Sequence, residues 1–310
     1  MSASTPSTPF RQGQYVRVKS EAEIATTLAG GKLEGIPFMP EMARYCGRTF
    51  RIHRRAMKTC VEGHSLRSLK GTLLLEDLRC RGEFHDGCQR NCRFFWKEAW
   101  LAPVPPPGEG DAPRPPASDA GSAWTGGLPT REGDRYLCQS TELFNATGQL
   151  SRWNVTHFIS EIRAGELSIP AFLHILRDTL LDRVGRALGL GRKGVPRGWA
   201  REAPSRGGLD LKAGEWVEVK SVDEIRRTLD AEGKHRGLSF EPDMVDFTGQ
   251  RFEVEFPVRN IILEQTGKMI HLEHTVALKG VACHGTCAMN CPRNNTLYWR
   301  EIWLRRAGKA

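Results

Sequence analysis

The residues of this chain best suited to chemistry are its nine cysteines. Six of them form two short groups, which are Cys80, Cys88 and Cys92, and Cys283, Cys287 and Cys291. Thiolate sulfur is a preferred ligand of zinc and of iron–sulfur clusters, and each needs about four such ligands. Each group therefore predicts a metal site that takes its fourth ligand from elsewhere in the chain.

Other cysteines can complete the two sets. Cys60 or Cys46 could join the first group, and Cys138 could join the second. The predicted metal ligands are Cys60, Cys80, Cys88, Cys92, Cys138, Cys283, Cys287 and Cys291. His85 and His284 lie inside the two groups and could replace a cysteine, because imidazole nitrogen also binds these metals.

The spacing of the cysteines bears on the metal. The Cys-x2-Cys pair that is typical of zinc sites does not occur. We therefore expect an iron–sulfur cluster, with zinc as the alternative cofactor and unligated thiols as the third possibility. In a reducing compartment a disulfide framework is not expected.

The elements that must position these cysteines occur twice. Residues 13–28 match residues 214–229, and the match resumes at Gly35/Gly237 and ends at Leu101/Leu304. Cys80 precedes Trp96 by 16 positions, and Cys283 precedes Trp299 by the same interval. A repeat of this kind indicates duplicated structural units, and the shared cysteine frame indicates a shared purpose.

Each copy has the same predicted elements. Residues 15–18 and 216–219 alternate apolar and polar side chains, as a strand does. Ser20 and Ser221 each precede a glutamate by three positions, which is the capping box of a short helix. Further strand-like runs follow, and the tryptophans of the last strand are expected in the core. They are Trp96, Trp100, Trp299 and Trp303.

These elements predict an α+β fold with two homologous, small β-rich repeats, each an SH3-like barrel or sandwich, joined by a helical middle segment. The predicted boundaries are a disordered N-terminus at 1–12, repeat 1 at 13–102, a Pro/Gly linker at 103–130, the helical segment at 131–190, a basic linker at 191–212 and repeat 2 at 213–307. The helical segment is expected to pack on the repeats, or else on a membrane surface or a partner helix.

Charge and composition limit the function. The chain has 310 residues and a net charge of +9. The basic run Arg51, Arg54, Arg55 and Lys58 could attract phosphate, or it could be a solvated basic face. No aromatic side chains interleave with it, which weakens the case for single-strand binding. No apolar run spans a membrane, no secretory leader is recognised, and nucleotide-binding and zincin motifs are absent. A cytoplasmic location is expected.

The motifs also carry a resemblance. The runs Gly35–Met42, Arg79–Cys92, Phe95–Leu101, Tyr136–Leu143 and Tyr298–Leu304 resemble a family of uncharacterised bacterial proteins with a duplicated, cysteine-containing domain. The resemblance covers most of the chain outside the linkers. It implies no reaction, apart from a weak association with biosynthetic enzymes.

Two hypotheses of function follow. The first is a cytosolic metalloprotein, with an iron–sulfur cluster favoured over zinc, that acts as a redox or biosynthetic enzyme on a small-molecule or carrier-bound substrate. The second is a non-enzymatic module in which zinc staples two small barrels, and a basic surface binds nucleic acid or an acidic protein partner. Whether the protein is an enzyme stays open.

Overall fold

A computed structural model describes residues 10–62, 64–107, 125–150, 156–163, 165–187, 198, 208–285 and 290–309. It divides into two compact units. Unit 1 comprises residues 1–86, 93–172 and 264–268, and unit 2 comprises 87–92, 173–263 and 269–310. Cys287 and most of the two predicted linkers and of the predicted disordered N-terminus lie outside the described residues.

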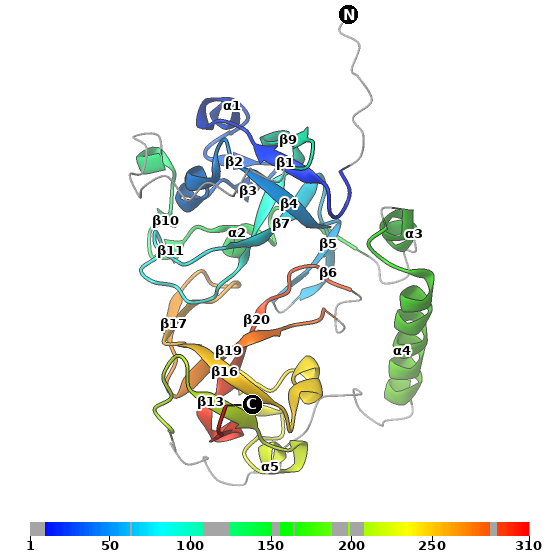
Figure 1. Ribbon diagram of the computed structural model, residues 1–310, viewed down its shortest axis with the longest axis vertical. Helices are drawn as coiled ribbons and strands as arrows, with labels where there is room; N and C mark the ends of the chain where they lie inside the picture. Colours follow the sequence, from blue (N-terminus) through cyan, green and yellow to red (C-terminus); the bar gives the residue numbers. More distant parts are fainter. Residues whose placement is uncertain are drawn as a thin grey trace, which may run out of the picture. The chain divides into compact units, whose positions relative to one another are not determined.

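The main sheet of unit 1 has five antiparallel strands in the order β8-β7-β4-β1-β9 (Figure 1). Its strands are β1 (Tyr15–Val18), β4 (Thr49–Arg55), β7 (Thr72–Arg79), β8 (Arg93–Lys97) and β9 (Leu101–Val104). The sheet curls into a half-barrel, and register shifts interrupt its β4/β7 and β7/β8 ladders.

Short elements connect these strands. They are α1 (Glu21–Ala25), β2 (Lys32–Leu33), β3 (Ile36–Pro37), the 3-10 helix η1 (Pro40–Tyr45), β5 (Lys58–Val61), β6 (His64–Ser68) and the 3-10 helix η2 (Glu98–Trp100). The predicted capping box is confirmed, since Ser20 and Glu23 each bond the backbone N–H of the other.

Unit 2 holds a similar curled sheet in the order β20-β19-β16-β13-β21 (Figure 1). Its strands are β13 (Trp216–Val219), β16 (Arg251–Pro257), β19 (Thr275–Ala282), β20 (Thr296–Arg300) and β21 (Leu304–Arg306). The connecting elements are α5 (Val222–Arg226), β14 (Lys234–His235), β15 (Leu238–Ser239), η4 (Pro242–Phe247), β17 (Asn260–Ile262), β18 (Met269–His271) and η6 (Glu301–Trp303). Ser221 and Glu224 repeat the capping box.

The two sheets match in detail. Bulges interrupt β4/β7 at Ile52/Arg54 and β16/β19 at Val254/Phe256, which are corresponding places. The prediction of two β-rich halves is therefore confirmed, whereas an SH3-like topology stays a prediction.

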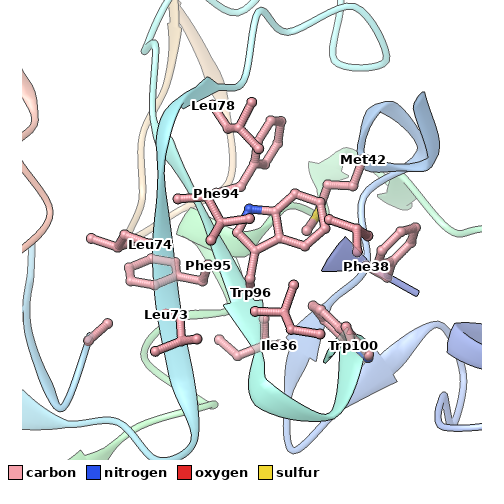
Figure 2. Close-up of a cluster of buried hydrophobic side chains, with 14 of the residues drawn as sticks. Ile36, Phe38, Met42, Leu73, Leu74, Leu78, Phe94, Phe95, Trp96 and Trp100 are labelled. Atoms are coloured by element: carbon pink, nitrogen blue, oxygen red, sulfur yellow. The ribbon is translucent and has the colours of Figure 1, made fainter. Parts of the chain in front are cut away.

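Each unit buries its two repeated tryptophans. In unit 1 the Phe38 ring meets Trp96 and Trp100 edge-on, and Figure 2 shows these rings within a cluster of buried hydrophobic side chains. Trp100 Nε1 donates to Thr27 Oγ1 at 3.0 Å, and Trp303 Nε1 donates to Thr228 Oγ1 at the same distance. All four tryptophans are buried, so their interpretation as core residues is confirmed.

The segment predicted to be helical has a mixed structure. Residues 131–150 form β10 (Arg131–Glu132), β11 (Arg135–Tyr136), the one-turn helix α2 (Gln139–Glu142) and β12 (Gly148–Gln149). The helices α3 (Thr156–Arg163) and α4 (Ile169–Ala187) follow (Figure 1), and a 3-10 turn, η3 (Thr125–Gly127), precedes. α2 is secured to unit 1 by Gln139, whose side-chain amide bonds both the N–H and the C=O of Phe95 at 2.8 Å.

Candidate functional site

The first predicted ligand, Cys80, lies directly after strand β7 and faces a carboxylate. Its thiol donates to Oε1 of Glu41 at 3.1 Å, and the Gly82 N–H donates to its sulfur at 3.4 Å. Glu41 belongs to η1, which packs its Met42 into the core and keeps the carboxylate 4% exposed. Packing of η1 therefore brings together two chemically active groups that are 39 positions apart.

His85 is the third member of this cluster and is only 1% exposed. Its Nε2 lies 2.9 Å from the carbonyl oxygen of Leu137, which can only accept, so Nε2 carries the proton in the neutral ring. The other nitrogen, Nδ1, then presents a lone pair at 3.9 Å from Glu41 Oε1. The interaction with Leu137 thus selects the tautomer and the orientation of the ring.

Two polar atoms of the cluster lack hydrogen-bond partners among the described residues. They are Nδ1 of His85 and Oε2 of Glu41, and both are buried. Nearly all buried polar atoms in folded proteins are hydrogen bonded, so an orphaned pair in one place calls for a ligand or an ordered water. The cluster of Cys80, Glu41 and His85 is hereafter the thiol–carboxylate–imidazole site.

Unit 2 has a related pair at the corresponding place. Cys283 donates to Oδ2 of Asp243 at 3.2 Å, and the Gly285 N–H donates to its sulfur at 3.2 Å. Here the same carboxylate oxygen also accepts the backbone N–H of His284 at 2.8 Å. The His284 ring turns instead toward Asp246 and Phe247, with Nδ1 3.8 Å from Asp246 Oδ2. Unit 2 therefore repeats the thiol and the carboxylate without the imidazole.

Cys88 and Cys92 belong to unit 2, whereas Cys60 and Cys80 belong to unit 1. Cys88 is buried, and its sulfur accepts the Ile262 N–H at 3.4 Å. Burial raises the pKa of the Cys88 thiol, and the nearby Cys92 raises it further.

Three other predicted ligands occupy separate places. Cys60 lies on β5, Cys138 immediately precedes α2 at the edge of the unit 1 core, and Cys291 is buried next to the Gly285 carbonyl. Cys287 lies outside the described residues. Cys46, the alternative to Cys60, is half-buried against the core of unit 1, and burial raises the pKa of its thiol to about 12.

The eight described cysteines are thiols rather than disulfides. Within the described ranges, no group of three or more Cys, His, Asp or Glu side chains is already placed to hold a metal ion. The two four-thiolate sets, the iron–sulfur cluster and the zinc alternative consequently stay predictions.

One member of the site was missed by the sequence reasoning. Glu41 stands between Pro40 and Met42, whose counterparts Pro242 and Met244 flank Asp243. The proline and the methionine are identical in the two copies and were matched. The acid between them was not matched, because it is glutamate in one copy and aspartate in the other. An acidic residue kept at that position in both copies was the available signal.

Comparisons with known proteins leave the site to be interpreted from its own geometry. The chain matches no protein-family model, no curated protein and no solved structure. Within the described residues, none of the helices offers the unbroken apolar length that a bilayer crossing demands.

Proposed function

We propose that this is a metal-binding protein whose first unit holds a divalent cation of the zinc type with Cys80, Glu41 and His85. The observation that carries the proposal is the pair of buried, orphaned atoms, His85 Nδ1 and Glu41 Oε2, beside a thiol. Thiolate, carboxylate and imidazole are the three ligand types that zinc accepts in proteins.

The distances support a site that metal binding would complete. Zinc binds sulfur at about 2.3 Å and oxygen or nitrogen at about 2.0–2.1 Å, so tetrahedral angles place S about 3.5 Å from O and O about 3.4 Å from N. The corresponding separations are 3.1 Å for Cys80–Glu41 and 3.9 Å for Glu41–His85. Each therefore needs to change by about half an ångström, as the thiol proton gives way to the ion.

The surroundings of the three side chains also suit a metal. A metal-bound histidine almost always donates its second N–H to a carbonyl or carboxylate. The Leu137 carbonyl accepts this hydrogen bond from His85 Nε2. The Gly82 N–H points at the Cys80 sulfur, where it would favour thiolate. These contacts orient two donors before any ion arrives.

The donor set also favours zinc over the iron–sulfur cluster, because a cluster takes four thiolates and this site supplies one. Three protein donors leave a fourth position for water or a substrate atom, which is the arrangement of catalytic zinc sites. Cys80 is half-buried, whereas Glu41 and His85 are buried. The role proposed for the protein is accordingly that of a metal-dependent enzyme, with the reaction unassigned.

Cobalt(II) titration tests this function, because thiolate-bound cobalt absorbs strongly in the near ultraviolet. Cys80→Ser and His85→Gln should each weaken binding of one equivalent by more than about 100-fold, which exceeds the usual loss from a residue that only orients a ligand. Cys46→Ser, in the same core but away from the site, is the matched control and should bind cobalt as the unaltered protein does.

Two results would decide against this site. If Cys80→Ser and His85→Gln take up cobalt like the unaltered protein, the three side chains are not ligands. If protein purified without oxygen carries iron and inorganic sulfide, the four-thiolate sets become the better explanation.

A further inference from the structure

A second cluster of unit 1 is cationic and lies on the half-barrel sheet. Arg79 on β7 and Arg93 on β8 stand directly opposite each other in the antiparallel ladder. Like charges in that relation destabilise a strand pair. His53 and Arg54 come from β4, which pairs with β7 on its other side. These four residues are hereafter the cationic cluster.

The cluster is partly withdrawn from water. Arg93 donates from NH1 to the Leu75 carbonyl at 3.3 Å, while its Nε is buried with no hydrogen-bond partner in the described part of the chain. Burial, followed by repulsion from Arg79, lowers the pKa of Arg93. Burial also lowers the pKa of His53 to about 4, and Arg93, Arg54 and Arg79 add to this effect in that order. Three guanidinium groups therefore act electrostatically on the His53 ring.

Two acidic residues also act on the cationic cluster. Asp77 acts on both His53 and Arg93, but it is exposed. Glu76 acts on Arg93 and forms an ion pair with Arg51 at 3.4 Å.

The rest of the basic run predicted to attract phosphate is engaged elsewhere. Arg55 pairs with Glu98 at 2.7 Å, and Lys58 pairs with Glu161 at 3.0 Å. Of that run, only Arg54 belongs to the cationic cluster.

Unit 2 shows that the fold itself does not require these arginines. In its corresponding ladder Ala282 stands opposite Thr296, where unit 1 has Arg79 opposite Arg93. The residue that corresponds to His53 is Glu255. The same sheet order and the same bulge thus form without any of these positive charges.

We propose that the cationic cluster binds an oxyanion of the phosphate type. Guanidinium groups present a planar set of N–H donors that matches phosphate oxygens, and an anion would relieve the repulsion between Arg79 and Arg93. The unpartnered Nε of Arg93 supplies a donor for it. This proposal is independent of the metal site, because it rests on other side chains.

Unit 2 also supplies the variant for the test, Arg79→Ala with Arg93→Thr, which installs residues that this backbone already accommodates. The probe is inorganic phosphate, compared with chloride at constant ionic strength. Phosphate should raise the Tm of the unaltered protein by several degrees, as a ligand of the folded state does. The double variant should show no such rise, and Arg51→Ala, outside the cluster, should keep it.

Nuclear magnetic resonance of His53 provides a second readout. Bound phosphate should raise the pKa of His53 by roughly one unit, because a nearby anion favours the charged ring. In the double variant that pKa should already be raised and should not respond to phosphate. If phosphate and chloride act alike on the unaltered protein, or if the folded double variant responds like the unaltered protein, the proposal is wrong.

Discussion

The thiol–carboxylate pairs of the two units differ by one methylene group and one ring. In unit 2, Oδ2 of the shorter Asp243 accepts two hydrogen bonds, one from the Cys283 thiol and one from the His284 backbone N–H. In unit 1 the longer Glu41 receives the Cys80 thiol on Oε1, and its Oε2 stays orphaned and buried. The comparison shows one carboxylate oxygen with two hydrogen-bond donors in unit 2 and, in unit 1, a second carboxylate oxygen with no partner among the described residues.

The histidines sharpen this difference. The ungapped alignment places His85 opposite Ala288, so the second copy has no imidazole at that position. The cationic cluster is likewise present in unit 1 and replaced in unit 2 by Ala282, Thr296, Glu255 and Phe256. The two units therefore share a sheet topology but differ in these side chains. The thiol–carboxylate–imidazole site and the cationic cluster both lie in unit 1.

The largest effect is expected where the two units are alike. Trp100→Ala and Trp303→Ala each remove a buried indole that is hydrogen bonded to a threonine at 3.0 Å. Each should cost about 3–5 kcal/mol of unfolding free energy. Denaturant unfolding, monitored by hydrogen exchange, would measure the loss of unfolding free energy in each variant. Clearly unequal losses would show that the two cores are not equivalent.

The next effect tests where the units differ. Glu41→Gln should weaken cobalt binding at least about 10-fold, since an amide is a poorer ligand than a carboxylate. Asp243→Asn should leave the tight cobalt equivalent unchanged, because that carboxylate faces no imidazole. Isothermal titration calorimetry measures the cobalt affinity of both variants. Equal losses of affinity would mean that the two thiol–carboxylate pairs contribute equally to metal binding.

A pH effect should also be confined to unit 1. Burial raises the pKa of Glu166 to about 7, although its Oε1 accepts the Arg55 N–H at 2.6 Å. Because the folded-state pKa exceeds the unfolded value, Glu166 favours folding below about pH 4.5, and that contribution is lost as pH rises through 7. Glu166→Gln should therefore exceed the unaltered protein in Tm at pH 8, with the gap closing toward pH 5. A gap independent of pH would contradict this assignment.

The smallest effect is again a matched pair. Ser20→Ala and Ser221→Ala each remove the side chain that caps a short helix, with nearly identical geometry in the two units. Each should cost about 1 kcal/mol. Thermal unfolding of the two variants should give similar losses, and a negligible loss in one unit would show that its cap is dispensable.

Much of the fold followed from the repeat. Alternation predicted β1 and β13, the serine–glutamate spacing predicted the caps of α1 and α5, and the paired tryptophans predicted the cores. Such signals lie within a few residues of one another, and their geometry depends mainly on the local backbone. The stretch at 131–150 departed from its predicted helix because Gln139 docks onto β8 by contacts between distant residues.

The candidate site followed from the sequence only in part. Cys80 was singled out as a ligand, and His85 was named as a possible replacement for a cysteine. Glu41 was missed, because only the packing of η1 against the end of β7 brings it to the thiol. The orphaned atoms, which carry the argument for a ligand, depend on burial and on hydrogen-bond partners, and neither can be read from spacing.

The sequence by itself determined that this protein is a duplicated, cysteine-rich, basic chain with short strands and capped helices. Periodicity, caps and repeat identity all express short-range physics, which nearby residues control. Only the tertiary structure decided which thiol meets a carboxylate, which histidine keeps an unused lone pair, and which arginines face each other across a ladder. Those relations arise because packing joins residues tens of positions apart, and the two copies pack nearly the same backbone around different side chains.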